Sequence, residues 1–372
     1  MIKGAAYTIA AMGDVMLART VGDRFHRSPE DFRLDKISNL LSGHDLVFAN
    51  LENPVSARGR PYKIQDPNIT FCAHPGSLRI LKNLGVTAIS IANNHMFDYG
   101  EEALLDTIVC LDQSKIRHVG AGRTYREANE PTLLDRNEIS VAIVGAVMMY
   151  SASTRMAGRN SPGVADHRLR KILASIRKLR SDGYHVLVSI HWGHEYSFFP
   201  VPYQMRQARQ MIDAGASLVL GHGPHYPQGI EKYKNGRIVY SLGNFIFDEP
   251  LKYANYSFIF SAGITASGNV VDSRIHPVVI KQGVPSLVDG HLRERIERVV
   301  AHLTSVYPTK DKKFWKDTSN RYLRDIVRRV TTMGSFKFVF LPPLSFYFEI
   351  GFSNLLKKLS LRNLKWLLKR AR

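Results

Sequence analysis

The sequence predicts an α/β sandwich, in which helices cover β-sheets. Short apolar runs alternate with amphipathic helical segments up to about residue 220. Several of these runs end directly in Gly, Asn, His or a carboxylate. Two further strand-like segments, residues 257–264 and 270–280, then follow one another across the turn Ser267-Gly268-Asn269. Alternating strands and helices followed by paired strands are typical of α/β folds.

Hydrophobic periodicity predicts the individual elements. The helix expected over residues 100–114 has Leu104, Leu105, Ile108 and Leu111 on one face. The remaining expected helices span residues 34–41, 75–84, 167–180, 202–214 and 287–308. The expected strands before residue 250 are 7–12, 45–49, 88–92, 140–147, 185–190, 218–220 and 237–242. The pair after residue 250 is expected to close the sheet.

Length and composition indicate an ordinary globular chain. Its 372 residues, 44% of them hydrophobic, are ample for a large core. Two cysteines, Cys72 and Cys110, argue against a disulfide scaffold and are too few for a zinc cluster. The start of the chain runs directly into a short strand, and Asp14 would interrupt the apolar stretch of a signal peptide, so we expect no signal peptide. Because no apolar run reaches about 18–20 residues, we expect no spanning helix.

The positive charge is concentrated at the C-terminus. The last 62 residues hold 15 basic and 4 acidic side chains, which gives 11 of the 19 net positive charges. Residues 353–372 place leucines and a tryptophan on one broad face and Lys/Arg on another, as an interfacial helix on anionic lipid does. A helix packed on the domain or on a partner protein is the alternative. No nucleic-acid role is expected, because this tail is rich in Leu, Phe and Trp.

We therefore expect a main domain over residues 1–285 and a basic helical extension over residues 286–372. The extension would contact a membrane surface, which predicts a cytoplasmic or peripheral membrane protein.

Polar side chains follow several of the expected strands. Asp14 and Glu52 come after the first two, although Asp14 could instead cap a helix and Glu52 could belong to a turn before Pro54. Because strand ends meet at one edge of an α/β sheet, these side chains should converge there. The candidate metal ligands are Asp14, Glu52, Asn94, His191, His222 and His225.

This mixed set of oxygen and nitrogen donors suits Mn²⁺, Fe²⁺ or Zn²⁺ better than Ca²⁺ or Mg²⁺. Six ligands suit two ions bridged by one carboxylate, an arrangement that activates water for phosphoryl displacement. His95, next to Asn94, would protonate the leaving oxygen, and Asp98 would orient His95.

Residues 56–76 are rich in Pro, Gly, Lys and Arg and are expected to form a long loop over the site. Arg58, Arg60 and Lys63 could bind an anionic substrate there, although a solvated loop is the plainer interpretation. Glu195 and Asn244, which follow two other strands, complete the predicted substrate-binding residues.

Five motifs in this order resemble the CapA family of bacterial capsule synthesis proteins, which are associated with poly-γ-glutamate. The motifs are Gly13-Asp14, Asn50-Leu51-Glu52-Asn53-Pro54, Ala92 through Asp98, His191-Trp192-Gly193-x-Glu195 and Gly221-His222-Gly223-Pro224-His225. That family is similar in turn to the calcineurin-like metallophosphoesterases. The resemblance covers roughly residues 7–250.

The resemblance implies a four-layer αββα sandwich of the metallo-dependent phosphatase type. It also implies that Glu52 bridges two metals, that Asp14 and His225 bind the first, and that Asn94, His191 and His222 bind the second. In three places this chain departs from the phosphoesterase pattern. Met16 stands where a His is usual, Glu52 replaces an Asp, and one extra residue separates His222 from His225. We therefore expect one or two ions.

Two functions remain open from the sequence. The first is a metal-dependent hydrolase or transferase acting on a phosphoester or an anionic polymer. The second is a non-catalytic, membrane-associated accessory protein of anionic polymer assembly or export. Metal binding and an effect of His95→Ala would favour the first, whereas dependence on the basic loop and tail alone would favour the second.

Overall fold

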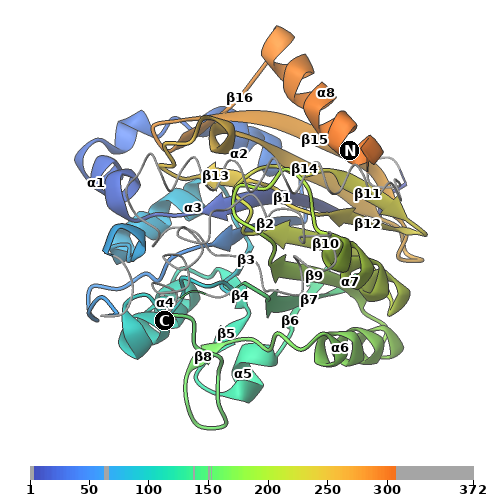
Figure 1. Cartoon of the computed structure of the whole chain (residues 1–372), viewed down its shortest axis with the longest axis horizontal. Coiled ribbons are helices and arrows are strands. Elements are labelled where there is room, and N and C mark those ends of the chain that lie inside the picture. The colour runs from blue at the N-terminus through green and yellow to red at the C-terminus, as the bar shows by residue number, and fades with distance from the viewer. Residues whose placement is uncertain (1–3, 63–66, 137–138, 150, 152, 307–372) are drawn as a thin grey trace, which may run out of the picture. The chain divides into compact units, whose positions relative to one another are not determined.

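The computed structural model describes residues 4–62, 67–136, 139–149, 151 and 153–306. These residues belong to the first of two compact units, Met1–Tyr307. They form two large sheets with helices on their outer faces (Figure 1).

The larger sheet has eight strands in the order β16-β15-β14-β1-β2-β3-β4, with β13 paired to β1 off this path. Strands β1, β2, β3 and β4 are parallel, and β14, β15 and β16 continue the sheet in antiparallel pairs. The bounds are β1 (Tyr7–Val15), β2 (Leu46–Leu51), β3 (Ala88–Ser90), β4 (Arg117–Val119), β13 (Asn244–Ile246), β14 (Tyr256–Ile264), β15 (Val270–Lys281) and β16 (Val284–Leu287).

The smaller sheet has six strands in the order β11-β12-β10-β9-β7-β6. Its central strands β12, β10, β9 and β7 are parallel. The bounds are β6 (Thr132–Arg136), β7 (Ile139–Val147), β9 (His185–His191), β10 (Ala216–His222), β11 (Ile230–Tyr233) and β12 (Gly236–Val239). A separate short pair joins β5 (Ala121–Gly122) to β8 (Gly163–Val164).

Helices cover the outer face of each sheet. On the side of the larger sheet lie α1 (Arg19–Arg27), α2 (Asp35–Leu41), α3 (Arg79–Asn83) and α4 (Gly100–Gln113). Helix α6 (Leu169–Ser181) contacts β7 and β9, and α7 (Pro202–Asp213) contacts β10, on the opposite side (Figure 1). The short α5 (Tyr125–Asn129) contacts β5.

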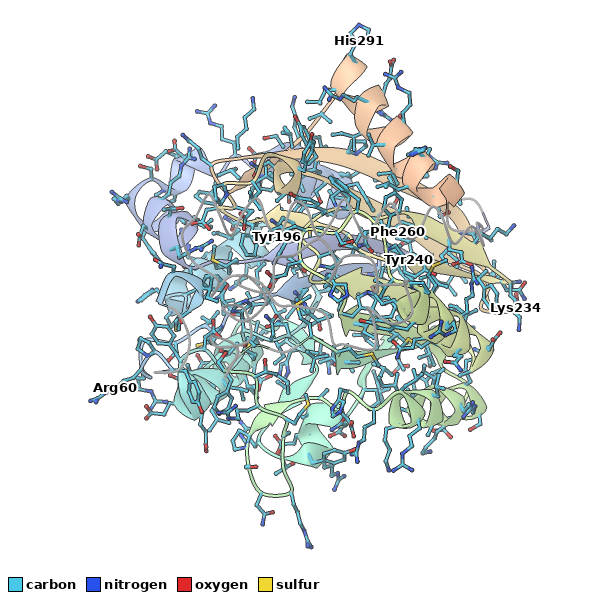
Figure 2. All side chains as sticks on the ribbon, viewed as in Figure 1. Arg60, Tyr196, Lys234, Tyr240, Phe260 and His291 are labelled. Atoms are coloured by element: carbon cyan, nitrogen blue, oxygen red, sulfur yellow. The ribbon has the colours of Figure 1, made fainter. Side chains whose placement is uncertain are left out.

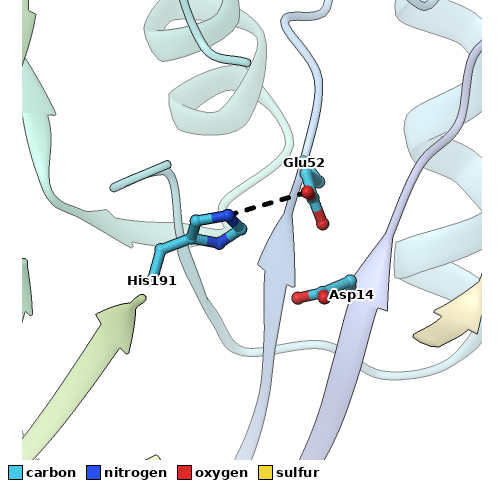
Figure 3. A group of neighbouring side chains, drawn as sticks. All are labelled: Asp14, Glu52 and His191. Carbon is cyan, nitrogen blue, oxygen red and sulfur yellow. Dashed lines mark ion pairs between the residues drawn. The ribbon is translucent and has the colours of Figure 1, made fainter. Parts of the chain in front are cut away.

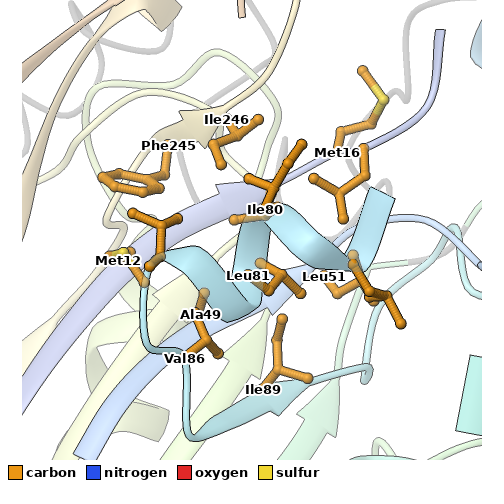
Figure 4. Packing of buried hydrophobic residues seen from close by; sticks show 14 of the residues in the cluster. Met12, Met16, Ala49, Leu51, Ile80, Leu81, Val86, Ile89, Phe245 and Ile246 are labelled. Atoms are coloured by element: carbon orange, nitrogen blue, oxygen red, sulfur yellow. The ribbon is translucent and has the colours of Figure 1, made fainter. Parts of the chain in front are cut away.

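Alternating side chains divide the core into layers. Met12, Ala49 and Ile89 face the helices α1–α4, and Figure 4 shows them with Leu81 of α3. Their strand neighbours face the other way, because successive side chains point to opposite faces of a sheet. A second core cluster joins the two sheets face to face and contains Ile9, Phe48, Val141, Leu187 and Leu218. The predicted four-layer αββα sandwich is confirmed.

The expected elements are present with shifted ends, and one of the largest shifts among the strands concerns residues 237–242. The strand predicted there is β12, which ends at Val239 in the smaller sheet, and an unexpected strand, β13, begins at Asn244 in the larger one. Gly243, with φ of 73°, lies between them in the left-handed conformation that favours glycine. Helices α1 and α5 and strands β4, β5, β6, β8, β11, β13 and β16 were not expected from the sequence.

The last described helix, α8 (Gly290–Val306), contacts β15 and β11 and buries Ile296 and Val300 in the core between the sheets. Residues 307–372 lie outside the described residues, so the basic extension and its domain boundary stay predictions. Within residues 4–306, apart from the short gaps given above, no helix is long and apolar enough to cross a membrane.

A buried carboxylate ties the segment before α6 to α5. Asp166 is 6% exposed and accepts hydrogen bonds from the Tyr125 hydroxyl (2.7 Å) and the Arg168 Nε (2.9 Å). Burial alone raises the pKa of Asp166, but the bonds from Arg168 and Tyr125 outweigh it and hold the pKa well below its usual range.

Asp166→Asn should therefore lower the free energy of unfolding by about 1–3 kcal/mol at pH 7. A carboxylate whose pKa is depressed by folding stabilises the protein above its unfolded pKa, near 4, and this contribution is lost as the pH falls further. Urea unfolding at pH 7 and pH 3 should show the difference between wild type and variant shrinking at the lower pH. A constant difference would contradict this account.

Candidate metal centre

The polar residues at the strand ends converge between the two sheets. Asp14 is the penultimate residue of β1, and Glu52 immediately follows β2. His191 and His222 are the last residues of β9 and β10 and stand directly opposite one another in that parallel pair. All four side chains are buried, with at most 1% exposed.

Asp14 is held from several directions. Its Oδ1 accepts a hydrogen bond from the Asn50 side chain (2.9 Å), and its Oδ2 accepts one from the backbone N–H of Gly223 (3.2 Å). The His222 Nδ1 lies 3.2 Å from Oδ1, and the His225 Nδ1 lies 3.6 Å from Oδ2. The carboxylate of Asp14 therefore contacts residues from both sheets.

Asp14, Glu52 and His191 together form a possible metal site. Each offers one ligand atom, and the three atoms lie within 4.8 Å of one another. Figure 3 shows the two carboxylates on neighbouring strands and the imidazole reaching them from β9, with the His191 Nε2 at 3.7 Å from the Glu52 Oε1.

The charges in this cluster are strongly coupled. Burial and the negative charge of Asp14 raise the pKa of Glu52 well above its usual range. Burial alone would also raise the pKa of Asp14, but contacts with His222 and His225 hold it well below the usual range. Burial lowers the pKa of His191 to about 3, so its imidazole is neutral near pH 7, the form that binds metals.

His225 is the second histidine of the turn after β10 and has a left-handed backbone, with φ of 58°. Its Nδ1 lies 2.9 Å from the Asn244 Oδ1, and its Nε2 lies 3.7 Å from the Glu52 Oε1. Asn244 stands opposite Asp14 in the β1–β13 pair. This predicted substrate-binding residue therefore lies inside the cluster and orients a predicted ligand.

Several buried polar atoms in the cluster have no hydrogen-bond partner. They are the Glu52 Oε2, the Asn94 Oδ1, the His191 Nε2 and both ring nitrogens of His222. The His222 Nδ1 has the Asp14 carboxylate nearby as an ion-pair contact, which is not a hydrogen bond. A buried polar atom without a partner costs about 1–3 kcal/mol, so such atoms are rare unless a ligand satisfies them. All five belong to side chains that bind divalent metals, and the chemistry of the site therefore fits a metal ion.

His95 and Asp98 form a pair beside the candidate ligands. The His95 Nδ1 lies 2.8 Å from the Asp98 Oδ2. Asp98 is fully buried and also accepts hydrogen bonds from the Phe71 N–H (2.9 Å) and the Ser153 hydroxyl (2.7 Å). The Asp98 carboxylate is therefore held in place, and it in turn holds the Nδ1 of the His95 imidazole, whose residue is 6% exposed.

Met16, one of the three predicted departures from the phosphoesterase pattern, is a core residue. It is fully buried in the cluster under α1–α4, and its sulfur accepts the Ala18 N–H at 3.2 Å (Figure 4). Its thioether therefore packs within the core and is hydrogen-bonded locally.

Of the three predicted basic substrate residues, the structure describes Arg58 and Arg60. Arg58 forms an exposed ion pair with Asp106 of α4. Arg60 lies at the margin of the molecule and points outward (Figure 2), and Lys63 lies outside the described residues. Glu195 is half-buried and close enough to influence the pKa values of Glu52 and His225.

The structure adds three residues that the sequence did not single out. Asn50 donates to Asp14 and lies 3.4 Å from the His191 Nδ1, so it connects ligands of the two sheets. Phe71 packs its ring on that of His95, with centroids 4.5 Å apart. Ser153 binds Asp98. Of the three, only Asn50 could have been found from the sequence, because it ends an apolar strand two residues before Glu52.

Comparisons with known proteins agree with this architecture. The family model described as "Bacterial capsule synthesis protein PGA_cap" matches residues 8–249. The capsule biosynthesis protein CapA of Bacillus anthracis is 31% identical over 304 residues, covering 80% of this chain and 74% of that protein. The PGA biosynthesis protein CapA of Bacillus subtilis (strain 168) is 29% identical over 317 residues, covering 85% and 81%.

Among solved structures, the NAD nucleotidase NadN of Haemophilus influenzae matches with a TM-score of 0.46 and 11% identity, over 80% of this chain and 56% of that one. A TM-score below 0.5 carries no weight for function, so the candidate metal centre rests on the side chains described above. The family match spans β1 through β13 and thus every residue of that centre. The chain belongs to the family of bacterial capsule synthesis proteins described as PGA_cap.

Proposed function

We propose that this protein is a metal-dependent, phosphoesterase-like hydrolase in the synthesis of an anionic capsule polymer of the poly-γ-glutamate type. One or two divalent ions, Mn²⁺, Fe²⁺ or Zn²⁺, would be held by Asp14, Glu52, Asn94, His191, His222 and His225. The observation that carries this proposal is the set of unpartnered buried atoms on four of these side chains.

A divalent ion bound there would polarise the scissile group and lower the pKa of water. Asn50 and Gly223 would hold the Asp14 carboxylate in place through the bonds they donate. Asp98 would hold a proton on the Nδ1 of His95, so that the Nε2 can carry the proton delivered to the leaving oxygen. The burial of the site would exclude bulk water.

Metal analysis of the purified full chain tests the proposal. Wild type reconstituted with Mn²⁺, Fe²⁺ or Zn²⁺ should retain about one or two ions after desalting, and Asp14→Asn/His191→Ala should retain none. His118→Ala is the matched control, because His118 pairs with Asp112 through a partly exposed contact away from the cluster. It should bind as wild type does.

Two probes of different chemistry then test hydrolysis: a dialkyl phosphodiester, glycerophosphocholine, and a γ-glutamyl oligomer. Metal-dependent cleavage of either one supports the hydrolase. Metal binding without cleavage of either contradicts it and leaves the accessory protein of polymer assembly. A chain that holds no metal after reconstitution contradicts the metal centre itself. The proposed contact of the C-terminal tail with anionic lipid is independent of these outcomes.

A further inference from the structure

Arg19 has an unusual backbone close to the candidate metal centre. It is the first residue of α1, four residues after β1 ends, and its φ is 50°. A residue with a side chain loses about 1–2 kcal/mol in this left-handed conformation. Such strain persists where the surrounding contacts demand it, and it gathers at functional sites.

The side chain of Arg19 is held on two aromatic rings. Its guanidinium carbon lies 4.6 Å from the ring centroid of Phe71 and 5.9 Å from that of Phe247. One terminal nitrogen pairs with Asp248, and the other donates to the backbone oxygen of Asn68 at 3.2 Å. A guanidinium that is stacked on a ring and ion-paired at its edge is held in one position, and it keeps its positive charge.

These two rings each contact a histidine of the centre. Phe71 packs on His95, with centroids 4.5 Å apart and planes tilted by 34°. Phe247 packs on His225, with centroids 5.1 Å apart. Phe71 and Phe247 meet edge to face at 6.4 Å. The four rings therefore form one continuous row from His95 to His225, which we call the ring row, and Arg19 lies against its middle.

An arginine beside an active site can bind an anionic substrate or can hold other residues. Both terminal nitrogens of Arg19 already have partners within the chain. The side chain is 33% exposed, and its partner Asp248 is 12% exposed and neutralises its charge. These contacts favour a role in holding neighbouring side chains over a role in binding the substrate.

We propose that Arg19 is a positioning residue, which through the ring row fixes the imidazole planes of His95 and His225. This inference rests on the proposed function, in which His95 delivers a proton and His225 binds metal. A misplaced catalytic group costs rate even when the substrate still binds, and a 1 Å displacement can cost about a hundredfold.

Two substitutions separate the side chain from the strained backbone. Arg19→Ala removes the guanidinium and keeps the strain, whereas Arg19→Gly removes both, because glycine adopts positive φ at little cost. Both should lower kcat for glycerophosphocholine by about ten- to a hundredfold, with KM within about twofold. Arg19→Gly should nevertheless have the higher Tm. Arg19→Lys, which keeps the charge without the planar stack, should recover only part of kcat.

Arg24→Ala is the matched control, because Arg24 lies on the same helix and pairs with Asp31 at the surface. It should keep the kcat and KM of wild type. Wild-type kcat in both Arg19→Ala and Arg19→Gly would overturn the proposal. A kcat that rises and falls with Tm across the two variants would also overturn it, because lost stability would then explain the lost rate.

A spectroscopic readout keeps the inference separate from the proposed function. The imidazole nitrogen shifts of His95 and His225, measured by NMR in wild type and Arg19→Ala, should change if Arg19 orients these rings. If wild type binds metal but cleaves neither probe, the hydrolase fails while changed shifts still support the ring row. Unchanged shifts overturn the ring row whether or not the protein is a hydrolase.

Discussion

His95→Ala should lower kcat for a phosphodiester with an alkyl leaving group by about 10²–10⁴-fold, the usual contribution of a positioned proton donor. Metal content should stay at the wild-type level, because the ring is held by Asp98 and Phe71 and is not among the three residues whose ligand atoms cluster. Steady-state kinetics with glycerophosphocholine, together with elemental analysis of the same preparation, measures both quantities.

The leaving group provides the internal control for this prediction. A p-nitrophenolate ion departs without a proton, so hydrolysis of bis(p-nitrophenyl) phosphate should fall by less than about tenfold in His95→Ala. An equal loss with both substrates would show that His95 acts in some other way than as the proton donor. Asp98→Asn should lower kcat as His95→Ala does. The amide nitrogen of the new side chain is a donor, and it would face the Phe71 N–H, the Ser153 hydroxyl or the His95 Nδ1, which now donate to the carboxylate.

Gly13→Ala should destabilise the protein by about 3 kcal/mol or more, since it forces a side-chain atom into a filled space. A Cβ at residue 13 would lie 1.9 Å from the backbone oxygen of Gly243, which cannot move as a side chain could. That same oxygen accepts the Asp14 N–H at 2.9 Å, so the substitution also displaces a candidate metal ligand. The Tm should fall by roughly 5 °C or more, and the metal content should fall as well.

Gly43→Ala is the matched control for Gly13→Ala. A Cβ at residue 43 would meet no atom within 4 Å, and its backbone does not require glycine. It should leave Tm within about 2 °C of wild type and metal content unchanged, because surface substitutions without lost contacts usually cost less than about 0.5 kcal/mol. If Gly13→Ala matched this control, the close approach of β1 to the backbone of Gly243 would not govern the site.

The sequence alone determined the layered fold and the chemistry of the site. Apolar runs such as residues 45–49 and 185–190 are short and lie among turn residues, which is typical of buried strands, and the polar residue after each one then lies at a strand end. Asp14, Glu52, His191 and His222 were predicted to converge, and they do. This succeeds within each sheet, because strand positions and side-chain types can be read from the local sequence and parallel strands end at one edge. That the edges of the two sheets face one another was decided by how the sheets pack.

Tertiary structure alone decided which groups hold the site. The Phe71 ring on His95, the Arg19 guanidinium on that ring and the Asn50 bridge between the sheets join residues far apart in the chain. It also decided that Arg58 pairs with Asp106 instead of facing the site, and that Asn244 starts a strand beside Asp14. These contacts depend on how two sheets and a loop pack together, and the local hydrophobic pattern of the sequence does not predict that packing.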